Sequence, residues 1–249
     1  MCRHLVYLGA PQPLSRLLLD PPHSLVHQSW APRDMRGGGT INADGFGAGW
    51  YPPDGTEPIR YRRGTPMWSD ATLPGLATTT VSGAVLAAVR SATVGMPVVE
   101  TAAAPFATGP WLFSHNGVVA GWPDSVAKIA ERLPTRDLLT LEAPTDAALL
   151  WALVRDRLRA GVPMAEAVTS TVTEVDTAAP GSRLNLLLTD GTTAVATTFG
   201  HSLAVRSAGT SVLISSEALD DDRGWRPVPD RHLVTATAHT LDITPLGEA

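Results

Sequence analysis

Apolar and polar residues follow two different periods along the chain. Runs with a period of two, or continuous apolar runs rich in β-branched residues, predict strands at residues 3–9, 45–51, 83–90, 111–114, 183–189, 194–199, 211–215 and 232–237. Segments with apolar residues every three to four positions predict helices at residues 124–133, 146–160 and 164–175, with a shorter one at 14–20. Because strands come in runs and helices cluster mid-chain, the pattern favours an α+β fold over a repeating βαβ fold.

The composition is that of a globular protein with a large core. Of the 249 residues, 44% are hydrophobic and 17% are charged, which excludes wholesale disorder. Folds of this size often form one domain, so we expect a single domain over residues 1–249. Long loops that can wall a site are expected at residues 31–42, 64–80, 96–110 and 218–230.

Charge and cysteine content exclude several classes of protein. The formal net charge is −5, and the chain has no dense basic patch, so binding to nucleic acid or to an anionic membrane is not expected. The single cysteine rules out a disulfide framework and a thiolate metal cage. No apolar stretch approaches the ~20 residues of a membrane-spanning helix, and the N-terminus is unlike an export signal, so we expect a cytoplasmic protein.

Cys2 is the first candidate for chemistry, because it directly follows the initiator methionine. If the methionine is removed, this residue carries a thiol and a free α-amine, and an α-amine is a base of suitable strength near neutral pH. One residue then supplies both nucleophile and base. The alternative is that Cys2 is a small buried hydrophobic residue.

Two further motifs suit the recognition of charged groups. Arg90 ends an apolar strand, and Thr93 follows it in a turn, so both can bind one carboxylate. Alternatively, Arg90 pairs with a structural aspartate. Asp146, after Thr145 at a helix start, either stabilises the helix terminus or binds a substrate ammonium group.

The segment from Trp111 to Gly117 ends in an Asn-Gly pair. This pair is above all typical of a hairpin turn. The functional alternative is an oxyanion hole formed by the Asn116 side-chain amide and the Gly117 backbone N–H. His23 and His27 have helical spacing, but they flank no glutamate, so we expect no metal site there.

Taken in order, an N-terminal Cys, a Gly-rich strand, Arg-x-x-Thr, His-Asn-Gly and Thr-Asp resemble the class II glutamine amidotransferases, a family of N-terminal-nucleophile hydrolases. The resemblance covers essentially the whole chain. More segments are similar to one branch, the amidohydrolases of ergothioneine biosynthesis that remove glutamate from γ-glutamyl-hercynylcysteine sulfoxide. These segments are residues 1–4, 19–22, 28–32, 44–50, 89–97, 112–117, 196–200 and 220–232.

The resemblance implies a four-layer αββα sandwich, in which two antiparallel sheets pack face to face with helices outside. It also implies that Cys2 provides the nucleophile and the α-amine base, and that Asn116 and Gly117 form the oxyanion hole. The implied reaction is hydrolysis of the γ-glutamyl amide through a Cys2 thioester. No cofactor or metal is needed, and the expected partner is the small-molecule substrate, with the oligomeric state not predicted.

The same resemblance implies the groups that hold the substrate. Arg90 and Thr93 would bind the glutamyl α-carboxylate and Asp146 the α-ammonium group. His115 is not part of this family set; from its own place in the sequence we expect a structural hydrogen-bonding residue rather than a base, and we count it among the substrate-binding candidates. An aromatic side chain is expected to contact the trimethylammonium group of the leaving group, and the candidates are Trp30, Trp50 and Trp68. Arg3 stands where many relatives have glycine, which puts the use of plain glutamine in doubt.

Two alternatives stay open at this point. The chain can be a glutaminase subunit that supplies ammonia to a separate synthase, although the absence of a second catalytic domain in this sequence favours a free-standing hydrolase. It can also be a non-catalytic module that binds γ-glutamyl groups, if Met1 is retained.

Overall fold

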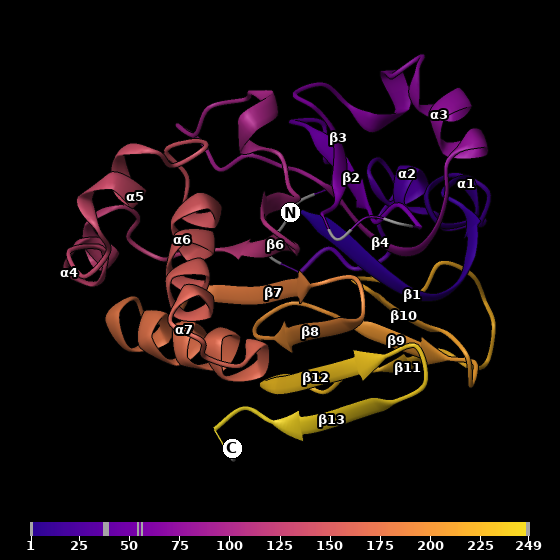
Figure 1. The fold of residues 1–249 in the computed structure, drawn as a ribbon. Coiled ribbons are helices and arrows are strands. Elements are labelled where there is room, and N and C mark those ends of the chain that lie inside the picture. Colours follow the sequence, from indigo (N-terminus) through magenta and orange to yellow (C-terminus); the bar gives the residue numbers. More distant parts are fainter. Residues whose placement is uncertain (1, 37–39, 54, 56, 248–249) are drawn as a thin grey trace.

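Two antiparallel sheets packed face to face form the centre of the computed structural model (Figure 1). The structure describes residues 2–36, 40–53, 55 and 57–247. Within these residues the strand order of the first sheet is β11-β9-β10-β1-β4-β2-β3, and that of the second sheet is β13-β12-β8-β7-β6-β5.

The first sheet holds the N-terminal strands and a group of strands from late in the chain. Its members are β1 (Arg3–Pro13), β2 (Phe46–Trp50), β3 (Ile59–Arg63), β4 (Val81–Val89), β9 (Ala204–Ser207), β10 (Val212–Ser215) and β11 (Arg226–Pro227). The second sheet consists of β5 (Phe106–Thr108), β6 (Trp111–Val118), β7 (Arg183–Thr189), β8 (Thr193–Thr198), β12 (His232–Thr237) and β13 (Leu241–Pro245).

Helices cover the outer face of each sheet (Figure 1). The first sheet is covered by α1 (Ser15–Leu18), α2 (Leu25–Gln28) and α3 (Leu73–Thr79). The second is covered by α4 (Ala127–Ala130), α5 (Thr135–Leu139), α6 (Asp146–Arg159) and α7 (Met164–Ala178). Short 3-10 turns lie at η1 (Met67–Ser69), η2 (Glu100–Ala102) and η3 (Asp124–Val126). In the described residues, none of the helices has the length and apolar character that crossing a bilayer requires.

Separate apolar clusters fill the spaces between successive layers. Along β1, Leu5 and Tyr7 pack against the helices of the first sheet, whereas Val6 and Leu8 face the second sheet. The same alternation holds along β7, whose side chains join either the α6–α7 cluster or the cluster between the sheets. Burial on both faces explains why these strands are continuous apolar runs in the sequence. The expected α+β sandwich with outer helices is therefore confirmed.

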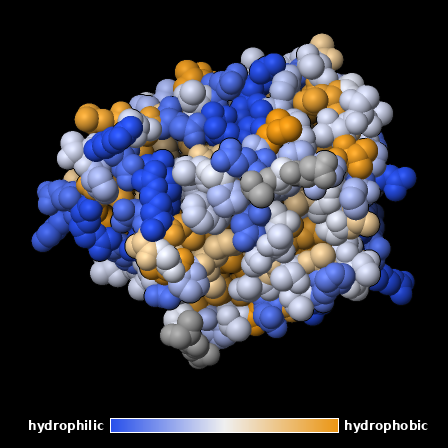
Figure 2. Space-filling model, viewed as in Figure 1, coloured by the Kyte–Doolittle hydropathy of each residue, from blue (hydrophilic) through white to orange (hydrophobic). Residues whose placement is uncertain are grey.

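The glycine-rich strand β2 allows the two sheets to approach closely. A Cβ atom at Gly47 would lie 2.4 Å from the carbonyl oxygen of Ala104, and one at Gly49 would lie 2.7 Å from Leu112. Both distances are shorter than real Cβ contacts, so larger residues would push the second sheet away. The surface itself mixes polar and apolar side chains, and Figure 2 shows polar ones gathered over α4 to α6 at the left.

Several expectations about individual elements were wrong. The Asn-Gly pair at 116–117 is not a hairpin turn, because β6 continues to Val118 and Gly117 pairs with Leu184 of β7. The helix expected at 124–133 is reduced to η3 and α4, and the loop expected at 64–80 contains η1 and α3. The edge strand β3 was missed because its side chains are largely half-exposed and polar, which removes the apolar pattern.

Candidate active site

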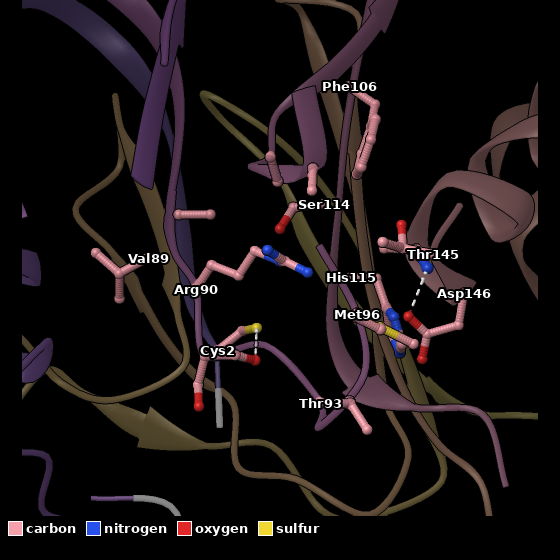
Figure 3. Close-up of a pocket in the computed structure, with 16 residues that line it drawn as sticks. Cys2, Val89, Arg90, Thr93, Met96, Phe106, Ser114, His115, Thr145 and Asp146 are labelled. Atoms are coloured by element: carbon pink, nitrogen blue, oxygen red, sulfur yellow. Dashed lines mark hydrogen bonds between the residues drawn. The ribbon is translucent and has the colours of Figure 1, made fainter. Parts of the chain in front are cut away.

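A pocket of about 480 Å³, its open mouth included, lies where β1 begins, β4 ends and α6 starts beside β6 (Figure 3). Strand pairing creates this meeting point, because Arg3 of β1 is opposite Val89 of β4, so the residues just beyond them are neighbours. The pocket brings together six residues that the sequence singled out: Cys2, Arg90, Thr93, His115, Gly117 and Asp146. Asn116 does not line it and is 1% exposed.

Cys2 is half-buried and its side chain lines the pocket. The thiol donates to the carbonyl oxygen of Ser91 at 3.7 Å, and the Cys2 carbonyl oxygen accepts from Nη1 of Arg3 at 2.9 Å. In Figure 3 the sulfur lies beneath the Arg90 side chain, which extends into the pocket. The nucleophile candidate is thus held by its backbone while its sulfur stays accessible.

Arg90 brings an uncompensated positive charge to the pocket. It is 8% exposed, and Nη1 donates to the carbonyl oxygens of Pro97 at 2.8 Å and Asp44 at 3.4 Å. Within the described part of the chain no carboxylate pairs with it. The Asp44 carboxylate instead accepts from the backbone N–H of Ala92, so pairing of Arg90 with a structural aspartate is wrong. A buried guanidinium group without a counter-ion favours binding of an anion.

Asp146 brings the opposite charge to another wall of the pocket. As the first residue of α6, it accepts from the backbone N–H of Ala147 at 2.8 Å and of Val119 at 3.0 Å. Thr145 caps the same helix by accepting from Ala148 at 3.3 Å. These bonds fix the carboxylate but leave it further acceptor capacity. A positive and a negative group across one pocket suit the carboxylate and ammonium of an amino-acid head.

Gly117 and His115, both on β6, also line the pocket. A Cβ atom at Gly117 would lie 1.8 Å from the carbonyl oxygen of Arg183 on β7, so no larger residue fits at this position. Nε2 of His115 donates to that same carbonyl at 3.0 Å. This bond occupies Nε2, one of the two nitrogens of the imidazole ring.

Arg3 does not reach the pocket, in contrast to what its place beside the nucleophile suggests. Its side chain is 2% exposed, and Nε donates to Oε1 of Glu217 at 2.7 Å. Nη2 donates to the backbone carbonyl of Asp34. Together with the bond to the Cys2 carbonyl, these contacts fix the start of β1. The side chain of Arg3 is thus explained by a buried ion pair, not by a contact in the pocket.

Glu217 is the centre of this buried network, and no motif around it in the sequence points to this role. It accepts from Nε2 of His23 at 2.6 Å and from the backbone N–H groups of Arg33 at 2.8 Å and Asp34 at 3.2 Å. Burial alone would raise its pKa, but the hydrogen bond from His23 and the charge of Arg3 lower the pKa to about 2. The carboxylate is therefore ionised at neutral pH.

The tryptophans proposed to contact a ligand cation lie elsewhere. Trp50 is 8% exposed and packs in the apolar cluster beneath α1 to α3, so it cannot reach a ligand. Trp30 and Trp68 are exposed, but neither lines the pocket.

Known proteins similar to this chain were found by sequence and by structure. It is 42% identical over 250 residues to the γ-glutamyl-hercynylcysteine sulfoxide hydrolase of Mycolicibacterium smegmatis, which covers 99% of this chain and 100% of that protein. Against the same-named hydrolase of Mycobacterium tuberculosis the identity is 41%, over 100% of this chain and 98% of the relative. No family model matches the sequence.

Solved structures share the fold at lower identity. A class II glutamine aminotransferase domain protein from Silicibacter pomeroyi superposes with a TM-score of 0.69 at 24% identity, covering 98% of this chain and 99% of that one. The glutamine phosphoribosylpyrophosphate amidotransferase of B. subtilis gives a TM-score of 0.67 at 14% identity, over 100% of this chain and 50% of that one. These likenesses establish the fold.

The buried network predicts a pH-dependent stability. Since the folded-state pKa of Glu217 is about 2, below its ordinary value, its ionisation stabilises the fold above pH ~4.5, and this contribution is lost as the pH falls towards ~2. We expect Glu217→Gln to lower the free energy of unfolding at pH 7 by about 2 kcal/mol, allowing for solvent screening. Urea unfolding from pH 6 down to about pH 3 measures the difference, which should shrink in acid.

The exposed Glu131 supplies the matched control, because Glu131→Gln should leave the stability within ~0.5 kcal/mol at every pH. A Glu217→Gln difference that stays constant over this pH range would show that the carboxylate charge does not stabilise the fold.

Proposed function

The chain belongs to the family of the γ-glutamyl-hercynylcysteine sulfoxide hydrolases, and we propose that it hydrolyses the γ-glutamyl amide bond of γ-glutamyl-hercynylcysteine sulfoxide in ergothioneine biosynthesis. The products are glutamate and hercynylcysteine sulfoxide. The observation that carries this proposal is the 42% identity along the full length of both chains. Arg90 and Asp146, which have no ionic partner among the described residues, line one pocket with Cys2 and support it.

The proposed role of the two charged residues is to bind the glutamyl head. A γ-linked glutamyl group keeps its α-carboxylate and α-ammonium groups free. Arg90 and Thr93, which line the same pocket, would bind the carboxylate, and Asp146 would bind the ammonium group. Both charged side chains are already held by backbone contacts, so little ordering is required on binding.

Cys2 is the proposed nucleophile, with the α-amine that removal of Met1 exposes as its base. The amine takes the thiol proton, and the thiolate attacks the γ-carbonyl carbon to give a tetrahedral intermediate. As the C–N bond breaks, the α-ammonium group returns a proton to the leaving amine, and a γ-glutamyl thioester remains. Water then attacks the thioester, which releases glutamate and restores the thiol.

Gly117 and Asn116 are the proposed donors to the oxyanion of the intermediate. Gly117 lines the pocket, and as a glycine it does so with its backbone alone. The Asn116 amide lies behind the pocket wall and would donate through the Nδ2 hydrogen that its contact with Ser216 leaves free. Removing one donor of this kind typically lowers kcat by about 10²–10³-fold.

The substrate and the nucleophile are tested together. We expect glutamate release from γ-glutamyl-hercynylcysteine sulfoxide to be much faster than from glutamine, each measured in parallel with a glutamate assay. Cys2→Ala should abolish release while the fold and ligand binding persist, because the thiol alone forms the thioester. Near wild-type turnover by Cys2→Ala would refute nucleophilic catalysis, and faster release from glutamine would favour a glutaminase.

The binding role of Arg90 predicts a change in KM. Arg90→Lys keeps the positive charge but loses the planar fork, and one hydrogen bond to a charged group contributes about 1.5–3 kcal/mol. We therefore expect KM to rise about 10- to 100-fold with a smaller change in kcat. Arg136→Lys, on an exposed position of α5, is the matched control. An unchanged KM in Arg90→Lys would mean that Arg90 is structural.

A further inference from the structure

Polar side chains, rather than apolar ones, fill the space between the two sheets directly behind the pocket. We call these residues the inter-sheet bridge; each is at most 1% exposed, and they are His4, Ser114, Asn116 and Ser216. Farther along the same strands the space is occupied by apolar residues such as Val6 and Ile214. Buried polar groups are costly unless they are hydrogen-bonded, so the contacts of the bridge show how it is held together.

Ser216 is bound to the nucleophile strand through both backbone groups of His4. The Ser216 backbone N–H donates to the His4 carbonyl oxygen at 2.9 Å, and Oγ of Ser216 accepts from the His4 backbone N–H at 3.0 Å. His4 is two residues beyond Cys2, so these bonds fix Ser216 relative to the chain that carries the thiol.

The same hydroxyl reaches the second sheet. Oγ of Ser216 accepts from Nδ2 of Asn116 at 3.3 Å, and Asn116 lies on β6. Among the described residues, Oδ1 of Asn116 is buried without a hydrogen-bond partner. The orientation of this amide therefore depends on its single contact with Ser216, since nothing else in that part of the chain binds the side chain.

His4 adds a second, parallel link between β1 and β6. Its Nδ1 lies 3.2 Å from Oγ of Ser114, a residue of the pocket wall. Burial lowers the pKa of His4 to about 3, so the ring is neutral and adds no charge behind the pocket. The bridge thus fixes the positions of its side chains and adds no charge behind the pocket.

We propose that Ser216 is a positioning residue for the reaction, whose hydroxyl holds the Asn116 amide at a fixed separation from Cys2. The inference rests on the proposed function, in which Asn116 donates to the oxyanion. Because the oxyanion exists only after the thiolate has attacked, misplacing the amide affects the transition state and not the bound substrate. Loss of the Ser216 hydroxyl therefore lowers kcat and leaves KM nearly unchanged.

The test compares two adjacent serines. Ser216→Ala should lower kcat at least about 10-fold with KM within about twofold of wild type. Ser215→Ala is the matched control, because Ser215 is fully buried and its hydroxyl has no partner among the described residues; its kcat should not change. Rates are expressed per mole of folded protein, with the folded fraction of each variant measured by circular dichroism.

A double-mutant cycle separates positioning from a general structural effect. If Ser216 acts through Asn116, the double variant Ser216→Ala/Asn116→Ala should be no slower than Asn116→Ala alone, within about twofold. Losses that multiply, or a Ser216→Ala variant with wild-type kcat, would overturn the inference while leaving the hydrolase function intact. Wild-type kcat in Asn116→Ala would remove both this inference and the oxyanion role of Asn116, and the Cys2→Ala result would still test the hydrolysis itself.

Discussion

The antiparallel pairing of β1 with β4 determines where the chemistry takes place. Its register sets Arg3 opposite Val89, which brings Cys2 and Arg90 to the same end of the first sheet. A slip of one residue would turn every side chain of β1 to the opposite face. Leu5 and Tyr7 would then leave the helical side and Val6 and Leu8 the space between the sheets, so burial on both faces protects this register.

The buried charged groups near this end of the first sheet follow two patterns. Some are compensated within the protein, as Arg3 is by Glu217, and these hold the backbone of Cys2 and the neighbouring loop. Arg90 and Asp146 line the pocket without an ionic partner in the part of the chain that the structure describes. Burying these two opposite charges therefore costs desolvation free energy. A γ-glutamyl head would offset this cost by supplying an ionic partner for each charge.

The sequence predicts the central strands and most of the pocket, because buried strands are continuous apolar runs and because Cys2, Arg90 and Asp146 stand in recognisable contexts. It could not predict the edge strand β3, whose largely half-exposed polar residues carry no alternation. It also could not predict contacts such as Arg3–Glu217, which join residues 214 positions apart, or the bond from Asn116 to Ser216. The Asn-Gly pair is typical of a hairpin turn, but no turn forms there, because the pairing of β6 with β7 overrides the local preference of the two residues.

The account depends on a thiol and a free α-amine on one residue, facing a pocket with two opposite charges. The most direct test is the intact mass of the purified, active chain, measured on the same sample whose hydrolysis rate is known. The account predicts that the active protein lacks Met1 and begins at Cys2. A chain that retains Met1 and still hydrolyses γ-glutamyl-hercynylcysteine sulfoxide at the full rate would contradict it.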